Sequence, residues 1–120
     1  MPYGPLLLTT GRASRLLKAM GNERRLLILC HLSKREHSVT ELCRLVGLSQ
    51  SALSQHLAKL RHDNLVATRR SAQTVFYSVA SPEVLPILET LRDLFAPAGS
   101  RRPDRAETTD TTAAWLISDD

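Results

Sequence analysis

SVTELCRLVGLSQSALSQHLAKLR, the segment Ser38–Arg61, has the pattern of two short helices joined by a tight turn. Ser38 and Glu41 form a capping-box pattern at the start of the first helix. Gly47, which takes a positive φ easily, ends that helix, and Leu48 anchors the turn in the core. Apolar residues at helical spacing predict the buried side of the first helix: Val39, Leu42, Leu45 and Val46.

The second helix, residues 49–62, combines an inward apolar stripe with an outward polar face. Ser49 is its predicted N-cap. The stripe consists of Ala52, Leu53, Leu57 and Leu60. Four uncharged polar residues of the first turns remain outside: Gln50, Ser51, Ser54 and Gln55. Because Gln pairs well with adenine and Ser with several base edges, this face is typical of a helix that lies in the DNA major groove. The alternative is an ordinary surface helix with a solvated polar face.

A strand pattern replaces the helical pattern after this segment. Asn64 tolerates left-handed geometry and ends the helix. Residues 65–70 and 74–80 predict the two strands of a hairpin, the wing, with residues 71–73 at its tip. Arg69 and Arg70 lie beside the tip, so the hairpin carries them towards phosphate or a minor groove. The alternative is that Arg69 and Arg70 are two solvated arginines at a strand end, without a role in binding.

Two helices are predicted before this segment. The first begins at its cap, Thr10, and runs to residue 20, with Leu16 and Leu17 inside. Asn22 caps the second, Glu23–Ser33, whose dense apolar run indicates the buried central helix. The fold class is therefore mainly helical with a small hairpin, a winged helix-turn-helix in the order α-α-α-α-β-β-α.

The last predicted helix opens with Ser81 as its cap and Pro82 at its first helical position. It is more apolar than a two-stranded wing can cover. Together with the N-terminal helix it is a candidate dimer surface, and a dimer presents two recognition helices to a palindrome. The alternative is that this surplus belongs to the core of the same chain.

The composition fits one domain with a basic body. The chain has 120 residues, a net charge of +4 and a pI of about 9.6. We expect an N-terminal extension over residues 1–8, the winged helix over 9–96 and a flexible tail over 97–120. A basic body suits a polyanion, because phosphate neutralisation supplies most non-specific affinity. No nucleophile–base pair, phosphate loop or metal-ligand cluster stands out, so an enzyme is not expected.

The first residues have no positive region before their short apolar run, which predicts that no signal peptide is present. No apolar run reaches the length of a membrane span. We therefore expect a cytoplasmic protein without a membrane partner, whose two cysteines, Cys30 and Cys43, are reduced at rest.

Over residues 14–95 the chain resembles the ArsR/SmtB family of dimeric winged-helix regulators, most closely its HlyU/BigR-like branch. Three strings carry the resemblance: LLKAMGNERRLLILC at 16–30, LSQSALSQHLAKLR at 48–61 and AQTVFY at 72–77. The resemblance implies transcriptional control, often repression relieved by a signal. Within the HlyU-like members it implies opposing a silencing protein at virulence or secretion promoters.

The resemblance also implies that metal sensing and thiol sensing should be considered as signals for this protein. One family metal site has two cysteines in the pattern Glu-Leu-Cys-Val-Cys, but here only Cys43 is present, and the last helix has no His. No metal site is therefore expected, and a metal-responsive repressor remains an alternative. The HlyU/BigR-like branch carries a switch cysteine at Cys30 and a second at the position of Ala96. Single oxidation or persulfidation of Cys30, pairing with Cys43, and a plain core role remain open.

The sequence therefore predicts a homodimeric transcriptional regulator that binds double-stranded DNA. The residues expected to hold phosphates or flank the groove are Ser49, His56, Lys59, Arg69, Arg70 and Gln73. No cofactor and no small-molecule substrate is predicted. The competing hypothesis is a winged helix that binds proteins and has lost DNA binding.

Overall fold

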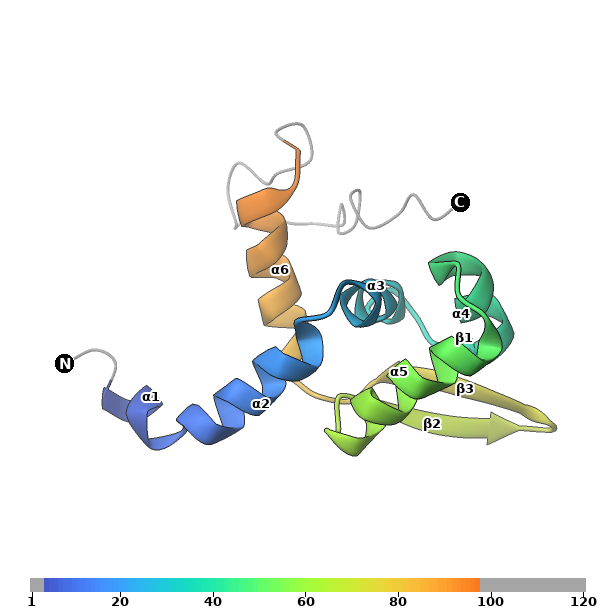
Figure 1. Cartoon of the computed structure of the whole chain (residues 1–120), viewed down its shortest axis with the longest axis horizontal. Coiled ribbons are helices and arrows are strands. Elements are labelled where there is room, and N and C mark those ends of the chain that lie inside the picture. The colour runs from blue at the N-terminus through green and yellow to red at the C-terminus, as the bar shows by residue number, and fades with distance from the viewer. Residues whose placement is uncertain (1–3, 98–120) are drawn as a thin grey trace.

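Six helices and three strands form the part of the chain that the computed structural model describes, residues 4–97, with α3 at its centre (Figure 1). The elements are α1 (Gly4–Leu8), α2 (Thr10–Met20), α3 (Glu23–Leu32), β1 (His37–Ser38), α4 (Val39–Val46), α5 (Gln50–His62), β2 (Val66–Ser71), β3 (Thr74–Val79) and α6 (Val84–Phe95). The winged helix-turn-helix prediction is confirmed, with one helix and one strand more than expected.

The boundaries of α4 and α5 follow the predicted caps. The Ser38 hydroxyl accepts from the Glu41 amide at 3.2 Å, and the Glu41 carboxylate accepts from the Ser38 amide at 3.1 Å, which completes the capping box. Gly47 has φ +74° and reverses the chain between the helices. The Ser49 hydroxyl then accepts from the Ala52 amide at 3.1 Å and starts α5. Local hydrogen bonds therefore define the helix-turn-helix.

The core lies between α3, α4 and α5 and is closed by β2 and by the first turns of α6. The largest side chains without exposed surface are Ile28, Leu29, Leu42, Leu53, Leu57, Leu60 and Val84. The apolar run of α3 lies at the centre of this cluster, as its sequence predicts. Asn22 caps α3 by accepting from the amides of Arg24 and Arg25. Burial of this cluster therefore packs α3, α4 and α5 against one another.

The predicted hairpin is present as β2 and β3, and a third strand that was not predicted joins it in a sheet of order β1-β3-β2. The two residues of β1 pair antiparallel with β3, His37 with Tyr77 and Ser38 with Phe76. The hairpin tip is also shorter than predicted, since Ser71 pairs with Thr74 and only residues 72–73 form the turn. The added strand ties the base of the wing to the start of α4.

Helices α2 and α6 differ from the prediction in where they begin, and α2 also differs in which side chain it buries. The N-cap of α2 is Thr9, whose side chain makes no capping hydrogen bond, and a short helix, α1, precedes it. Leu17 was expected inside but is 58% exposed, whereas Leu16 packs against the core. Ser81 binds Glu83 in a turn ahead of α6, so the regular helix begins at residue 84 rather than at the proline.

The predicted flexible tail, residues 97–120, lies outside the described residues apart from its first position. Within residues 4–97, no helix is long and apolar enough to cross a membrane.

Candidate nucleic-acid interface

The first turns of α5 present a polar surface on a helix whose opposite side is buried. Leu53 and Leu57 have almost no exposed surface. The four residues predicted to meet base edges are all exposed: Gln50, Ser51, Ser54 and Gln55. Because burial fixes the rotation of the helix about its axis, these side chains keep one outward direction. The predicted outward position of these four side chains agrees with their exposure, and their contacts with bases stay a prediction.

The C-terminal end of α4 is held by a contact from α3. The Arg24 guanidinium donates to the Val46 carbonyl at 3.0 Å, at the end of α4 and next to the reversing Gly47. This bond satisfies a carbonyl that the helix end leaves without an intrahelical partner. Sequence reasoning assigned no role to Arg24, since nothing local links it to a position 22 residues further on.

His56 and Lys59 are less free than the first turns. His56 is half-buried, and burial, followed by the charges of Arg25 and Arg24, holds its pKa below 6.5. The imidazole is therefore mainly neutral at pH 7 in the free protein. Lys59 lies 3.3 Å from a buried oxygen of Asp63, close enough for an ion pair although the angle is not that of a hydrogen bond. Ser49, also predicted at the phosphates, is exposed but already caps the helix.

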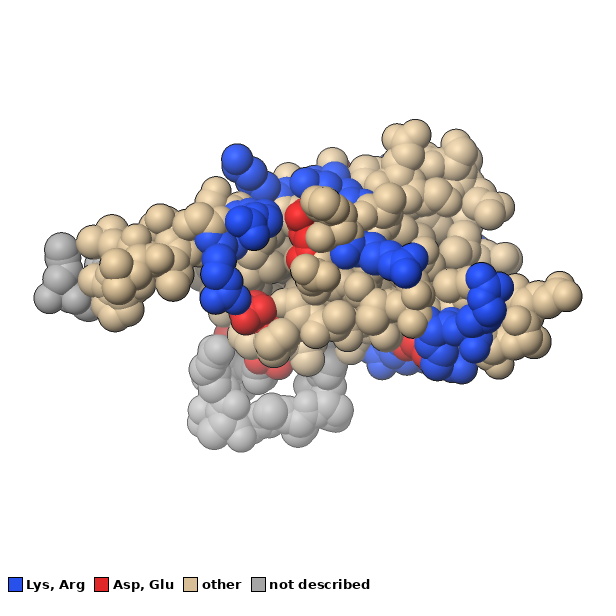
Figure 2. Space-filling model, turned by 90° about the horizontal axis from the view of Figure 1, so that it is seen from below, with Lys and Arg blue, Asp and Glu red and all other residues tan. Residues whose placement is uncertain are grey.

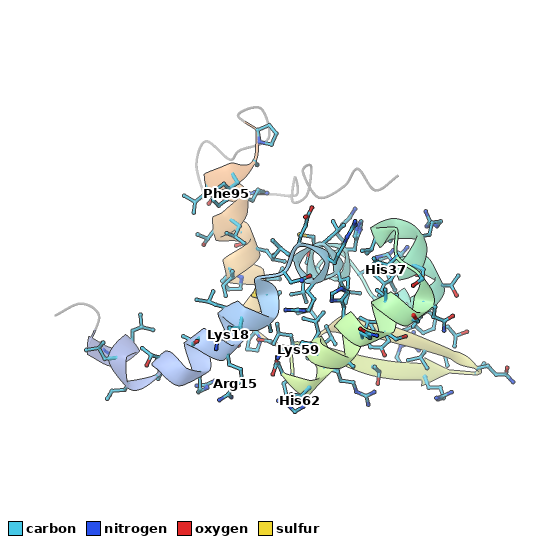
Figure 3. All side chains as sticks on the ribbon, in the orientation of Figure 1. Arg15, Lys18, His37, Lys59, His62 and Phe95 are labelled. Atoms are coloured by element: carbon cyan, nitrogen blue, oxygen red, sulfur yellow. The ribbon has the colours of Figure 1, made fainter. Side chains whose placement is uncertain are left out.

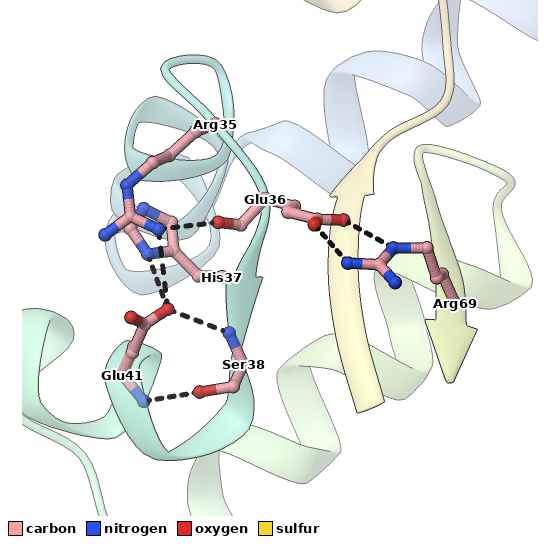
Figure 4. A network of polar contacts seen from close by, with 6 residues as sticks. All are labelled: Arg35, Glu36, His37, Ser38, Glu41 and Arg69. Carbon is pink, nitrogen blue, oxygen red and sulfur yellow. Dashed lines mark hydrogen bonds and ion pairs between the residues drawn. The ribbon is translucent and has the colours of Figure 1, made fainter. Parts of the chain in front are cut away.

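Arg69 and Arg70, adjacent on β2, have opposite surroundings. Arg69 forms a bidentate contact with Glu36 across β3, with its Nε 3.1 Å from the carboxylate, and its guanidinium lies 4.7 Å from the centre of the Phe76 ring (Figure 4). The hydrogen bond from Arg69 holds the pKa of Glu36 below its usual range. Arg70 points to the other face of the strand and is exposed. Within residues 4–97 no carboxylate pairs with it.

A second polar contact joins β1 to the capping box of α4. The Nδ1 atom of buried His37 is 3.2 Å from the Glu41 carboxylate, and Arg35 approaches the same carboxylate at 3.6 Å (Figure 4). The backbone bond from Ser38, followed by His37 and Arg35, keeps the pKa of Glu41 low. One carboxylate therefore caps α4 and ties it to the sheet edge.

Lys and Arg side chains recur over the face seen from below, from the side of α2 to the side of the wing, with some acidic side chains among them (Figure 2). Gln73, at the exposed tip of the wing, lies at the far end of the hairpin. An outward polar helix turn flanked by cations matches what a duplex offers, base edges in a groove between two rows of phosphates.

The two cysteines are free thiols. Burial raises the pKa of the Cys30 thiol from 9.0 to about 11, which disfavours the reactive thiolate. Cys43 is partly buried against the same core. In the described part of the chain no group of three or more His, Cys, Asp and Glu side chains is placed to hold a metal ion.

A capped helix-turn-helix followed by a basic hairpin defines a winged-helix DNA-binding regulator. The family model "Bacterial regulatory protein, arsR family" matches residues 22–68. The transcriptional activator HlyU of Vibrio cholerae is 57% identical over 89 residues, 74% of this chain and 82% of HlyU. The chain therefore belongs to the ArsR family, and it is a DNA-binding transcriptional regulator rather than an enzyme.

Solved structures agree with this assignment. Reduced HlyU from Vibrio cholerae superposes with a TM-score of 0.72 at 54% identity, covering 78% of this chain and 98% of that one. The transcriptional repressor BigR from Xylella fastidiosa gives 0.77 at 30% identity, covering 81% and 99%. A homodimeric winged helix-turn-helix DNA-binding domain from Mycobacterium bovis, a possible ArsR-family regulator, gives 0.65 at 26% identity, covering 78% and 85%. The predicted HlyU/BigR-like relationship is confirmed.

Proposed function

We propose that this regulator binds a palindromic operator as a homodimer, with α5 in the major groove and the wing on the flanking backbone. The observation that carries the proposal is the exposed polar turn of α5. Gln50 and Gln55 have amide groups suited to adenine, and Ser51 and Ser54 suit several base edges. Their helix is fixed on its buried side, which supports a rigid approach to the groove.

The phosphate contacts of the proposal come from residues around that turn. Arg70 and Lys59 supply charge, Gln73 supplies an amide at the tip, and Ser49 lies at the N-terminus of α5, where free backbone amides favour an anion. The sequence position of Arg69 predicts phosphate binding, but its contacts favour a different role. Its contact with Glu36 supports a role in holding the wing at a fixed angle, with phosphate binding left mainly to Arg70.

The dimer is supported by large apolar side chains left exposed on α1, α2 and α6. These are Leu6, Leu7, Leu8, Leu17, Leu85, Leu94 and Phe95. Figure 1 shows α6 and the α1–α2 arm projecting from the helix-turn-helix, on parts that do not carry the polar turn of α5. Large apolar side chains exposed together on these helices favour an association site, and the homodimeric relative from Mycobacterium bovis supports a second copy as the partner.

The proposal is tested by gel shift with genomic fragments, combined with sedimentation of the same protein. We expect one retarded species whose bound fragments share an inverted repeat. Leu94→Asp on α6 should give monomers that bind at least tenfold more weakly, because the two half-sites are then bound independently. The proposal that a homodimer binds a palindrome would be contradicted if the wild-type protein were monomeric. It would also be contradicted if the bound fragments lacked an inverted repeat.

A second question is whether the thiol of Cys30 controls DNA binding, since one similar structure is that of reduced HlyU from Vibrio cholerae. We propose that Cys30 reacts only slowly with peroxide, because the residue is only 6% exposed and the pKa of its thiol is raised. In the Cys43→Ser variant, the remaining thiol should outlast a free cysteine under the same peroxide. Rapid oxidation coupled to loss of DNA binding would instead establish Cys30 as a sensor.

A further inference from the structure

Helix α2 has two exposed flanks of different chemistry. One side packs against the core through Leu16, Ala19 and Met20. At 3.6 residues per turn, the flank on one side of that stripe carries Thr10, Ser14 and exposed Leu17. The flank on the other side carries Arg15 and Lys18, whereas Arg12 is in line with the packed stripe, near the exposed start of the helix. The cations are therefore separated from the apolar surface assigned to the dimer.

The basic flank of α2 faces the C-terminal end of α5. Arg12 and Arg15 line one cleft together with Asp63 and Asn64, the two residues that follow α5. Figure 3 labels Arg15 and Lys18 on α2 and Lys59 and His62 on the last turns of α5, which lies beside α2 in this view. On the face seen in Figure 2, Lys and Arg side chains recur from the side of α2 to the side of the wing, with some acidic side chains among them.

Two hydrogen bonds from Arg25 of α3 hold the C-terminal end of α2. The Arg25 Nε donates to the Ala19 carbonyl at 2.7 Å, and its Nη2 donates to the Lys18 carbonyl at 3.2 Å. These are carbonyls at the end of α2 that have no partner within the helix. Arg25 is also close enough to His56 to lower the pKa of that imidazole. Arg25 of α3 therefore anchors the end of α2, and its charge also acts on His56 of α5.

Arg15 and Lys18 differ from Arg12 in their acidic surroundings among residues 4–97. Within residues 4–97, no carboxylate forms an ion pair with Arg15 or Lys18. Arg12 differs, because its charge contributes to the low pKa of Glu83. Unpaired cations held next to a groove-binding helix are suited to the phosphates that border that groove.

We propose that Arg15 and Lys18 of α2 form a second phosphate-binding surface, which contacts the DNA backbone beside the major groove occupied by α5. This inference rests on the proposed function and extends its contact surface outside the helix-turn-helix and the wing. The partner is duplex DNA, for two reasons: the charges are complementary, and Arg15 lines a cleft that reaches the C-terminal end of α5, the helix of the proposed interface. The contacts are to phosphate, so they add affinity without adding sequence preference.

The test is the salt dependence of binding to a mixed-sequence duplex of 40 base pairs. Each lost phosphate contact lowers the slope of log K against log[NaCl] by about 0.9. Arg15→Gln/Lys18→Gln should therefore flatten the slope by about two per protomer, and each single variant by about one. Gln has a helix propensity close to those of Arg and Lys, so α2 is retained. Arg15→Lys/Lys18→Arg, which keeps both charges, should keep the wild-type slope.

The matched control is Lys34→Gln/Arg35→Gln, which removes the same charge after the opposite end of α3. We expect this control to change the slope by much less than the α2 variant. Equal flattening in both would mean a general charge effect and would overturn the proposal. An unchanged slope in the α2 variant, with a flattened slope in Lys59→Gln/Arg70→Gln, would overturn it while leaving the proposed function intact. If all three double variants bind as the wild type does, the proposed function itself fails.

Discussion

Helix α5 and the wing are both assigned to DNA, but they are held in position in different ways. The orientation of α5 comes from its buried leucines and from the Ser49 cap, all within its own segment. The orientation of the wing depends on Arg69 and Glu36, which are 33 residues apart, and on the short strand β1. A locally encoded element and an element fixed by distant contacts should respond differently to substitution.

The largest expected difference concerns the buried side of α5. Leu57→Ala should lower the free energy of unfolding by about 2–5 kcal/mol, because a fully buried leucine leaves a cavity. Urea denaturation measures this loss. Gln55→Ala, on the exposed side of the same helix, is the control and should change it by less than about 0.5 kcal/mol. Equal losses would mean that the two faces of α5 are misassigned.

The next effect concerns recognition by the exposed side. Gln55→Ala should cost about 1–3 kcal/mol of discrimination between the selected operator and a mixed-sequence duplex of the same length. Its affinity for the mixed duplex should stay within about twofold, since no phosphate contact is removed. Competition binding measures both constants. Equal weakening on the two duplexes would place this side chain at the backbone rather than at a base.

The wing provides a comparison between adjacent residues. Arg70→Gln should flatten the salt slope by about 0.9 per protomer, the value of one phosphate contact. Arg69→Gln should leave the slope almost unchanged and instead speed amide hydrogen exchange in β2 and β3, because it removes the contact with Glu36. The reverse assignment, with the larger slope change in Arg69→Gln, would show that Arg69 leaves Glu36 to bind DNA.

The smallest effect is a pH dependence from His56. Its pKa is lower in the folded protein than in the unfolded chain, so the unfolded chain takes up a proton first as the pH falls through 6.5. Stability contributed by the neutral imidazole is therefore present above that pH and declines below it. Unfolding at pH 7.5 and 5.5 should show a smaller difference in His56→Gln than in the wild type. His62→Gln, an exposed control on the same helix, should keep the wild-type difference.

The features predictable from the sequence were those encoded by neighbouring residues. The capping box at Ser38, the reversal at Gly47 and the exposed turn of α5 depend on spacings of a few residues, and all are present. Strand β1 was missed because two residues carry no strand pattern. The pairing of Arg69 with Glu36 depends on the strand order of the sheet, which no local pattern specifies.

Leu17 illustrates a different limit. Its position in an amphipathic helix predicts burial, yet it is exposed in the single chain. Helical periodicity indicates that a side chain faces an apolar partner, without indicating whether that partner belongs to the same chain. The same ambiguity applied to the apolar face of α6, where Leu94 and Phe95 remain exposed.

The central claim is that the exposed turn of α5 meets the bases of a duplex. The most direct measurement is an NMR titration of ¹⁵N-labelled protein with the operator selected by gel shift, following the side-chain amides of Gln50 and Gln55. We predict that these amide signals shift on binding, and that the shift of Gln55 disappears when the base pair specified through Gln55 is replaced. Unshifted amides in a saturated complex would contradict the claim, because the duplex would then be bound through another surface.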